Sequence, residues 1–311
     1  MSDALAEAKA LWAGVDLGGT GTRMVVADSS GGTHAVESVP TRSFAGSAPD
    51  DAASLLVDAL LDMIPSGSGL VGVGIGASGP VDLTTGVINN PDTLPWFSGI
   101  DLVGLMADRM GLPVWIDNDA VVAGLAESTW GAGAGHDSVL CVTLGTGIGV
   151  ALIEGGQPRR GGDGQHPEGG HIAVGGTGSP CYCGLDQCWE QVASRSALDR
   201  LMVRHGLEPW ADAPREVWAE YASQLTRGLI THTSIQRPSA VVISGSVVSR
   251  WDHLREPLLT VLANRDYGDR PVEVLPGTMG DEAGALGASL LPQRRIGHAS
   301  SGATAGNVDP R

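Results

Sequence analysis

The sequences AGVDLGGTGTRMVVA (residues 13–27) and VLCVTLGTGIGVALIE (residues 139–154) share one pattern. In each, an apolar run passes through glycines and threonines into a second apolar run, which predicts a strand, a tight turn and a partner strand. Two copies of one unit indicate a duplicated architecture. We therefore expect an α/β protein with one such unit in each half.

The two turns are suited to binding phosphate. The first contains Gly18-Gly19-Thr20 and the second Gly145-Thr146-Gly147, and such turns offer backbone N–H groups and hydroxyls to an anion. The first is neither a Walker A loop, because no Lys-Ser or Lys-Thr follows it, nor a dinucleotide fingerprint, because a strand follows instead of a helix. Taken alone, it is equally explained as an ordinary glycine-rich hairpin.

A third glycine lies between an expected strand at 240–243 and an expected helix at 247–262. The intervening Ser244-Gly245-Ser246 lets a flat ring or a phosphate rest on the backbone. Together with the two turns, it indicates a nucleoside triphosphate accompanied by Mg²⁺.

Acidic side chains follow two of the expected strands. Asp16 ends the first strand, and Asp117-Asn118-Asp119 stand between an expected strand at 113–116 and a helix at 120–130. A helix cap explains one of these three polar residues but not all of them. Phosphoryl transfer needs one carboxylate to accept a proton. We predict Asp119 for that role, with Asp16 as the alternative base or as the group that orders Mg²⁺, and Asp117 as a cap or a supporting partner.

One histidine and three cysteines are close together in the sequence. His171, Cys181, Cys183 and Cys188 supply the four ligands that close a tetrahedral zinc site, which makes the site structural rather than hydrolytic. The acids Glu168 and Glu190 flank it, and a helix is expected at 189–201. A metal would therefore fix two acids and an imidazole, as recognition of a small polyol requires.

Composition excludes several classes of function. The chain of 311 residues has 35 acidic residues against 19 lysines and arginines, a net charge of -16. Such a balance argues against binding nucleic acid or an anionic membrane. We find no signal peptide and no apolar run of about 18 to 20 residues, the length of a membrane span. These features predict a cytoplasmic protein.

The chain resembles the ROK family of sugar kinases and repressors, within the hexokinase, Hsp70 and actin superfamily. The matching segments run in family order over nearly the whole chain. They are Asp16 to Thr20, Ile116 to Ala120, Leu144 to Gly149, Glu168 to His171, Cys181 to Gly184, Cys188 to Glu190, and Gly280 to Ala288.

The resemblance implies two RNase H-like (actin-like ATPase) lobes around an interdomain cleft, and usually a homodimer. We expect a small lobe at residues 1–118 and a large lobe at 119–280 with the zinc loop at 167–190. A last helix at 281–293 would cross back to the first lobe, followed by a disordered tail at 294–311.

The resemblance also implies an ATP- and Mg²⁺-dependent hexose 6-phosphotransferase, with glucokinase as the first hypothesis. Asp119 would be the base for the sugar 6-hydroxyl, while Asn118, Glu168, His171 and Glu190 would hold other hydroxyls. Zinc would be held by His171 and the three cysteines. The Ser-Gly-Ser loop stands where a glycine triplet is usual, but the added side chains are small, so ATP is expected as the donor.

Several alternatives stay open. Kinases of N-acetylglucosamine, N-acetylmannosamine or fructose fit the same motifs, and polyphosphate is a further possible donor. A non-catalytic sugar-binding regulator is an alternative of another class. A DNA-binding repressor is disfavoured, because only about a dozen residues precede Ala13, fewer than a helix-turn-helix domain needs.

Overall fold

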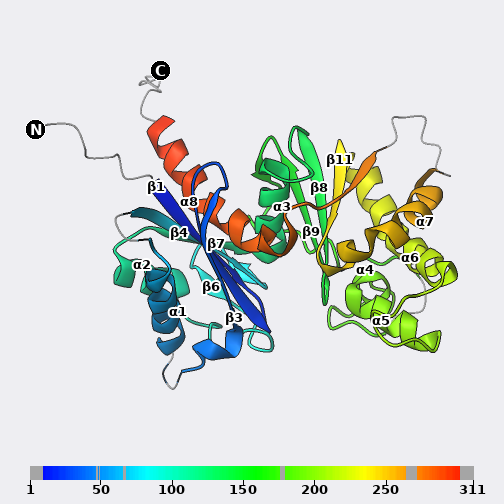
Figure 1. Cartoon of the computed structure of the whole chain (residues 1–311), viewed down its shortest axis with the longest axis horizontal. Coiled ribbons are helices and arrows are strands. Elements are labelled where there is room, and N and C mark those ends of the chain that lie inside the picture. Colours follow the sequence, from blue (N-terminus) through cyan, green and yellow to red (C-terminus); the bar gives the residue numbers. More distant parts are fainter. Residues whose placement is uncertain are drawn as a thin grey trace, which may run out of the picture. The chain divides into compact units, whose positions relative to one another are not determined.

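The computed structural model describes residues 10–46, 48, 50–65, 68–175, 179–263 and 272–301. Over these residues the chain forms two compact units, one ending at Val122 and resuming at Gly284, the other comprising Ala123–Ala283. The chain enters the second unit within helix α3 (Asp119–Thr129) and returns near the beginning of α8 (Ala283–Ser301) (Figure 1). No helix in this described part of the chain is long and apolar enough to cross a membrane.

The first unit is built on a sheet with the strand order β3-β2-β1-β4-β7. β1, β2 and β3 pair antiparallel, whereas β4 and β7 run parallel to β1. The elements of this unit are β1 (Ala10–Leu17), β2 (Gly21–Ala27), β3 (Thr33–Pro40), η1 (Thr41–Phe44), α1 (Asp51–Asp62), β4 (Gly69–Ala77), β5 (Val81–Asp82), β6 (Val87–Ile88), α2 (Leu102–Met110) and β7 (Val114–Asn118). Residues of α1 and α2 share a buried core with the sheet.

The second unit repeats this plan with the strand order β10-β9-β8-β11-β12. Here β8, β9 and β10 pair antiparallel, and β11 and β12 run parallel to β8. Its elements are β8 (Ser138–Leu144), β9 (Ile148–Glu154), β10 (Gln157–Pro158), α4 (Trp189–Ala193), α5 (Arg195–Arg204), α6 (Arg215–Gln236), β11 (Ala240–Ser244), η2 (Ser246–Arg250), α7 (Trp251–Ala263), β12 (Glu273–Pro276) and η3 (Gly280–Glu282). The duplicated α/β architecture predicted from the two strand-turn-strand units is confirmed.

Glycines in the first sheet allow α8 to lie directly on the strands. A Cβ atom added at Gly14 on β1 would overlap the carbonyl oxygen of Ala285, and one added at Gly74 on β4 would overlap that of Ala288. The backbone of the helix therefore approaches the backbone of the sheet more closely than side chains would permit. The last helix is part of the first unit for this reason.

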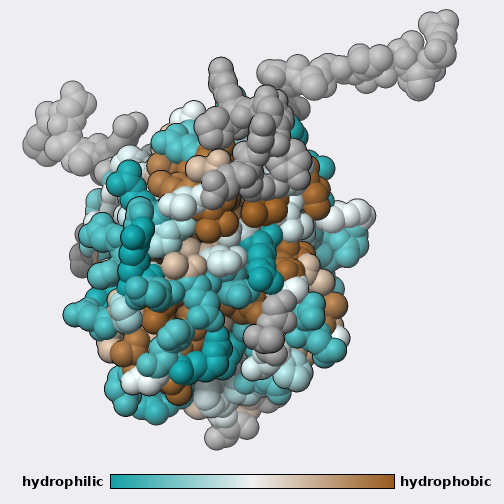
Figure 2. All heavy atoms as spheres, turned by 90° about the vertical axis from the view of Figure 1, so that its right-hand side faces the viewer, coloured by the Kyte–Doolittle hydropathy of each residue, from teal (hydrophilic) through white to brown (hydrophobic). Residues whose placement is uncertain are grey.

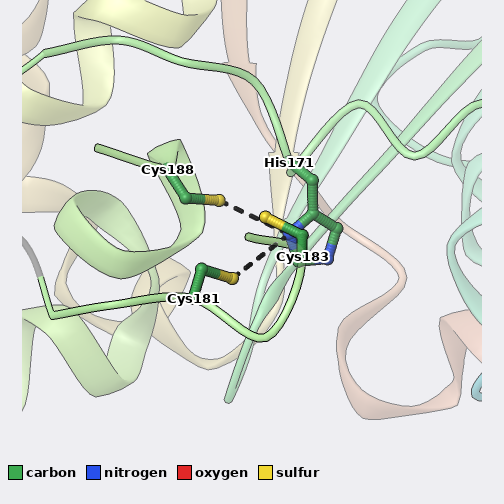
Figure 3. A group of neighbouring side chains, drawn as sticks. All are labelled: His171, Cys181, Cys183 and Cys188. Carbon is green, nitrogen blue, oxygen red and sulfur yellow. Dashed lines mark hydrogen bonds between the residues drawn. The ribbon is translucent and has the colours of Figure 1, made fainter. Parts of the chain in front are cut away.

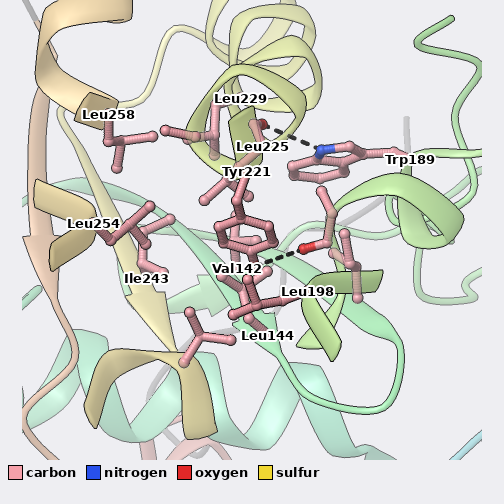
Figure 4. Packing of buried hydrophobic residues seen from close by; sticks show 14 of the residues in the cluster. Val142, Leu144, Trp189, Leu198, Tyr221, Leu225, Leu229, Ile243, Leu254 and Leu258 are labelled. Carbon is pink, nitrogen blue, oxygen red and sulfur yellow. Dashed lines mark hydrogen bonds between the residues drawn. The ribbon is translucent and has the colours of Figure 1, made fainter. Parts of the chain in front are cut away.

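The core of the second unit anchors the segment that follows the last cysteine (Figure 4). Trp189 is fully buried, and its indole Nε1 donates a hydrogen bond to the carbonyl oxygen of Leu225 on α6 at 3.2 Å. Tyr221, also on α6, donates from its hydroxyl to the carbonyl oxygen of Ala193 at 2.8 Å. These contacts fix α4, and with it the neighbouring Cys188.

The structure corrects two expectations about helices. The helix expected at 189–201 is two helices, because Ser194 adopts an extended conformation and its side chain accepts a hydrogen bond from Ala197 N, capping α5. The tail expected to be disordered from residue 294 is helical as far as Ser301, because adding residues to an existing helix is far easier than starting one. Residues 302–311 lie outside the described residues.

The boundaries between the units also differ slightly from those expected. They fall at Val122 within α3 and at Gly284 within α8. Where the chain passes from one unit to the other inside a helix, the apolar spacing of the helix continues without a break. The sequence therefore gives no sign of the boundary.

On the face drawn in Figure 2, hydrophilic and hydrophobic residues are interspersed.

Candidate functional site

The first unit gathers acidic side chains at the carboxyl ends of its parallel strands. Asp16 on β1 is in register with Gly76 on β4, and Gly76 is in register with Asp117 on β7. The carboxyl ends of parallel strands meet at one edge of a sheet, where ligands bind in many α/β proteins. The predicted residues Asp16, Asn118 and Asp119 are brought together at this edge.

Asp119 is held in place by two hydrogen bonds. Ser78 Oγ donates to Asp119 Oδ2 at 2.8 Å, and the backbone N–H of Ala120 donates to Oδ1 at 2.8 Å. Burial raises the pKa of the Asp119 carboxyl, and these two hydrogen bonds lower it in part. A fixed carboxylate with a raised pKa suits a general base, because its affinity for a proton is increased.

Asp16 has a similarly perturbed environment. Burial, followed by the negative charge of Asp119, raises its pKa to about 7, while Arg23 lowers it. The beginning of α8 packs against this carboxylate, since a Cβ atom added at Gly284 would overlap it. Two neighbouring carboxyls that repel one another are stabilised in their charged forms by a divalent cation, and carboxylate oxygens are the ligands that Mg²⁺ takes.

Asn118 and Asp117 shape the passage from β7 into α3. Asn118 Oδ1 accepts a hydrogen bond from Ala120 N at 2.9 Å, and Asp117 Oδ1 accepts one from Asn118 N at 2.8 Å. Asp117 is buried. These contacts fix the backbone from which Asp119 projects.

The first glycine turn is closed by hydrogen bonds to its base. Gly18 N donates to Gly21 O at 3.2 Å, and Thr41 Oγ1 donates to Gly18 O at 2.5 Å. Gly19 and Thr20 at the tip of the turn are exposed. The tip can therefore present its backbone and hydroxyl to a phosphate.

The second glycine turn lies beside the Ser-Gly-Ser loop of the same unit. Thr143 on β8 is in register with Ser244 on β11, and their hydroxyl oxygens are 3.0 Å apart. Gly245 has a φ of 85°, and a Cβ atom there would meet the carbonyl oxygen of Leu144 at 2.5 Å. The turn at 145–147 and Gly245 are thus brought to one edge of the second sheet.

The predicted zinc ligands converge (Figure 3). The Sγ atoms of Cys181, Cys183 and Cys188 and a ring nitrogen of His171 lie within 4.8 Å of one another. Nδ1 of His171 is 3.6 Å from Cys181 Sγ and 3.4 Å from Cys188 Sγ. Tetrahedral zinc, with Zn–S of about 2.3 Å and Zn–N of about 2.0 Å, separates sulfur from nitrogen by roughly 3.6 Å.

The chemistry and surroundings of this cluster fit a closed structural zinc site. Three thiols and one imidazole complete the tetrahedral set. Gln191 Nε2 approaches Cys181 Sγ at 3.7 Å, which gives that sulfur a supporting contact. Cys181 and Cys188 are buried and Cys183 is exposed.

Glu190 connects the cluster of His171 and the three cysteines to the second glycine turn. Its Oε2 accepts a hydrogen bond from Ile148 N at 3.1 Å and lies 3.9 Å from His171 Nε2. A Cβ atom at Gly147 would overlap the same carboxylate oxygen, so a side chain at that position would displace Glu190. The predicted residues of the metal loop and of the phosphate turn are therefore neighbours within the second unit.

The loop from Glu168 to His171 is also held firmly. His171 N donates to Glu168 O at 3.0 Å, and His232 Nε2 donates to the carbonyl oxygen of Gly169 at 2.9 Å. Burial lowers the pKa of His232, and the hydrogen bond to Gly169 partly offsets this effect. The Glu168 side chain is exposed, and Tyr182 Oη lies 2.7 Å from His171 Nε2.

Several supporting residues were missed by sequence reasoning. Ser78 reaches Asp119 from 41 residues away and His232 reaches Gly169 from 63 residues away, whereas Tyr182 stands between two of the cysteines and contacts His171. Glu127 on α3 is buried, and its carboxylate accepts hydrogen bonds from the backbone N–H groups of Ala132, Thr278 and Met279. A glutamate on an amphipathic helix is usually exposed, so the sequence gives no sign that Glu127 binds backbone N–H groups. The Gly-Thr-Met-Gly run at 277–280, which supplies two of these groups, can be predicted to be a loop.

Known proteins resemble this chain over most of its length. The ROK family matches residues 12–295. The glucokinase of Streptomyces coelicolor is 32% identical, over 89% of this chain and 96% of its own. The crystal structure of a ROK family glucokinase from Streptomyces griseus in complex with glucose and AMPPNP has a TM-score of 0.76 at 29% identity, covering 91% of this chain and 99% of that one.

A second solved structure gives the same result. ROK hexokinase from Thermus thermophilus has a TM-score of 0.78 at 29% identity, covering 93% of this chain and 99% of that one. Motifs, strand order and matches of this extent agree with one another. The chain belongs to the ROK family.

Proposed function

We propose that this protein is an ATP-dependent glucokinase that transfers the γ-phosphoryl group to the 6-hydroxyl of the sugar. The observation that carries the proposal is the Asp119 carboxylate, fixed by Ser78 and Ala120 and with its pKa raised by burial. Similarity to glucokinases along nearly the whole chain supports the same activity.

In this reaction Asp119 accepts the proton of the 6-hydroxyl as its oxygen attacks the γ-phosphorus. The bond from that phosphorus to the bridging oxygen breaks, and ADP leaves. Phosphoryl transfer asks the protein mainly for alignment and for stabilisation of negative charge. The turns at 18–20 and 145–147 and the glycine at 245 are proposed to hold ATP through their backbone. Asp16 is proposed to orient Mg²⁺, which supplies positive charge to the phosphates.

Sugar recognition is assigned to side chains that offer several hydrogen bonds. Asn118, Glu168, His171 and Glu190 are proposed to bind hydroxyl groups other than the one that reacts. Zinc bound by His171 and the three cysteines would hold the imidazole in one orientation and take no part in the chemistry. We also propose that the protein is cytoplasmic and that it forms a homodimer. Light scattering after gel filtration measures the mass of the assembly and tests the homodimer.

The first experiment is a coupled ADP-release assay with Mg²⁺-ATP and a panel of sugars: glucose, mannose, fructose, N-acetylglucosamine and N-acetylmannosamine. Glucose is expected to give the highest kcat/KM. A clear preference for an N-acetylated sugar or fructose would replace glucose as the substrate but retain the kinase. Absence of turnover on all five, with the protein folded and zinc bound, would refute the proposed activity.

Asp119→Asn tests the mechanism directly. Removal of the base is expected to lower kcat by about 10²- to 10⁴-fold, the usual contribution of general base catalysis. Glucose binding measured by calorimetry should persist, because the substitution preserves the shape of the side chain. A variant with near-wild-type kcat would remove Asp119 from this role.

A further inference from the structure

Tyr182 lies between two of the proposed zinc ligands, Cys181 and Cys183. Its hydroxyl oxygen is 2.7 Å from His171 Nε2, and its ring meets the imidazole edge-on, with centroids 4.9 Å apart. The Tyr182 side chain is nevertheless 85% exposed. The contact with His171 is thus the main interaction described for this side chain, and little packing opposes its rotation.

His171 has two ring nitrogens with different surroundings. Nδ1 faces the sulfur atoms of Cys181 and Cys188, at 3.6 and 3.4 Å. This arrangement leaves Nε2 as the nitrogen for a substrate. When Nδ1 binds a metal, Nε2 carries the proton and donates a hydrogen bond. In the structure, the oxygen positioned to accept that hydrogen bond belongs to Tyr182.

We propose that Tyr182 competes with the sugar for His171: its phenolic oxygen takes the position on Nε2 that a sugar hydroxyl requires, and the side chain rotates away when the sugar binds. This inference rests on the proposed function of the site. The neighbouring Glu190 carboxylate, 3.9 Å from the same Nε2, stays in place because it accepts the hydrogen bond from Ile148 N. The exchange replaces one hydroxyl by another on the same donor.

The flanking ligands make this movement simple. A metal held by Cys181 and Cys183 would fix the backbone on both sides of Tyr182, so that only the side-chain torsions change. Exposed side chains change rotamer in picoseconds to nanoseconds, much faster than turnover. Tyr182 is therefore expected to affect how tightly the sugar binds and not how fast the bound sugar reacts.

Tyr182→Phe tests the proposal, because it removes the competing oxygen and retains the ring. A hydrogen bond contributes modestly in water, so the KM and the calorimetric Kd for glucose are expected to fall by about 2- to 10-fold. kcat and the KM for ATP should be unchanged. In the wild type, the Tyr182 hydroxyl weakens the binding of every sugar substrate by the same factor. In Tyr182→Phe, the KM of each sugar substrate should therefore fall by that factor.

Tyr221→Phe is the matched control. It removes a hydroxyl of the same unit that bonds to the carbonyl oxygen of Ala193 in the core. This variant is expected to lose stability without any decrease in the Kd for glucose. Zinc content, measured by plasma mass spectrometry, should be equal in the wild type and in Tyr182→Phe.

Two results would overturn the proposal. A Tyr182→Phe protein with a higher KM for glucose or less zinc would mean that the hydroxyl orients His171 in support of binding. An unchanged Kd would mean that the hydroxyl and the sugar do not compete. Binding is measured apart from turnover, so tighter glucose binding without any phosphorylation would refute the kinase and retain the role of Tyr182.

Discussion

At the scale of single residues, the properties of Asp119 follow from what surrounds its carboxylate. Burial raises its pKa, and the hydrogen bonds from Ser78 and from the backbone of Ala120 act in the opposite direction. A base works in its deprotonated form. With Asp119 as the proposed base, activity is expected above the pKa of Asp119 and is expected to be lost as the pH falls through it. The acid side of the pH profile is therefore expected to report this pKa.

Ser78→Ala is therefore expected to move the acid side of the kcat/KM profile toward higher pH. The substitution removes a hydrogen bond to the charged carboxylate, which raises the pKa of Asp119 further. At the optimum, kcat should fall by less than about tenfold, the effect of one lost hydrogen bond. Ser98→Ala, which removes a hydroxyl that accepts from Asn90 N, is the control and should leave the profile in place. A profile unmoved by Ser78→Ala would contradict the assignment.

Asp119 was predicted as the base because it stands where a strand passes into a helix, which is a local pattern in the sequence. Ser78 precedes it by 41 residues and meets it only after β4 and β7 have paired. The same holds for His232 on α6, which donates to the carbonyl oxygen of Gly169 from 63 residues along the chain. Hydrogen-bond partners so far apart in the chain meet only through tertiary contacts, so the sequence around either residue does not predict them.

At the scale of elements, helix α8 depends on the absence of side chains beneath it. Gly74→Ala is expected to destabilise the protein by about 1 to 3 kcal/mol, since its Cβ atom would overlap the carbonyl oxygen of Ala288. Gly69→Ala on the same strand is the matched control, because a Cβ atom there meets nothing within 4 Å. Urea unfolding of both variants measures the difference. Equal stability would show that the helix can move away from β4 without cost.

Helix α3 is joined to the loop that precedes α8 through Glu127. Glu127→Gln leaves one oxygen to serve the backbone N–H groups of Ala132, Thr278 and Met279. The expected loss of stability is about 1 to 3 kcal/mol, the cost of a buried donor without a partner. Glu220→Gln removes a glutamate that pairs with Arg204 and His205 on the surface, where less than about 1 kcal/mol is expected. Thermal and urea unfolding compare the two variants.

Helix ends were the part of the fold that the sequence predicted least well. The break at Ser194 depends on a helix cap that competes with continuation of the helix. The sequence around Ser194 is compatible with one continuous helix and with two helices. Helix α2 was not predicted, although Asp101 caps its start and Gly111, with a φ of 65°, follows its end. Its short length gives too few turns for a clear apolar period.

At the scale of the whole molecule, metal binding should contribute to the stability of the second unit. Removal of zinc by a chelator is expected to lower the melting temperature by at least about 5 °C and to weaken glucose binding, because metal affinity and folding are linked. Added zinc should restore both. In Cys188→Ser, which lacks one ligand, the chelator should have little further effect. A fully active, equally stable protein without zinc would contradict the structural role of the cluster.

The sequence by itself determined the duplicated strand-turn-strand plan and the grouping of His171 with the three cysteines, because each depends on residues close together in the chain. It also led to the proposal of Asp119 as the base. The tertiary structure decided which groups from distant segments contact them: Ser78 at Asp119, Glu190 at the turn before Ile148, and α8 on the glycines of the first sheet. It also decided that the Tyr182 hydroxyl lies against His171. Periodicity and spacing report local conformation, whereas hydrogen bonds between distant segments exist only once the sheets and helices have packed.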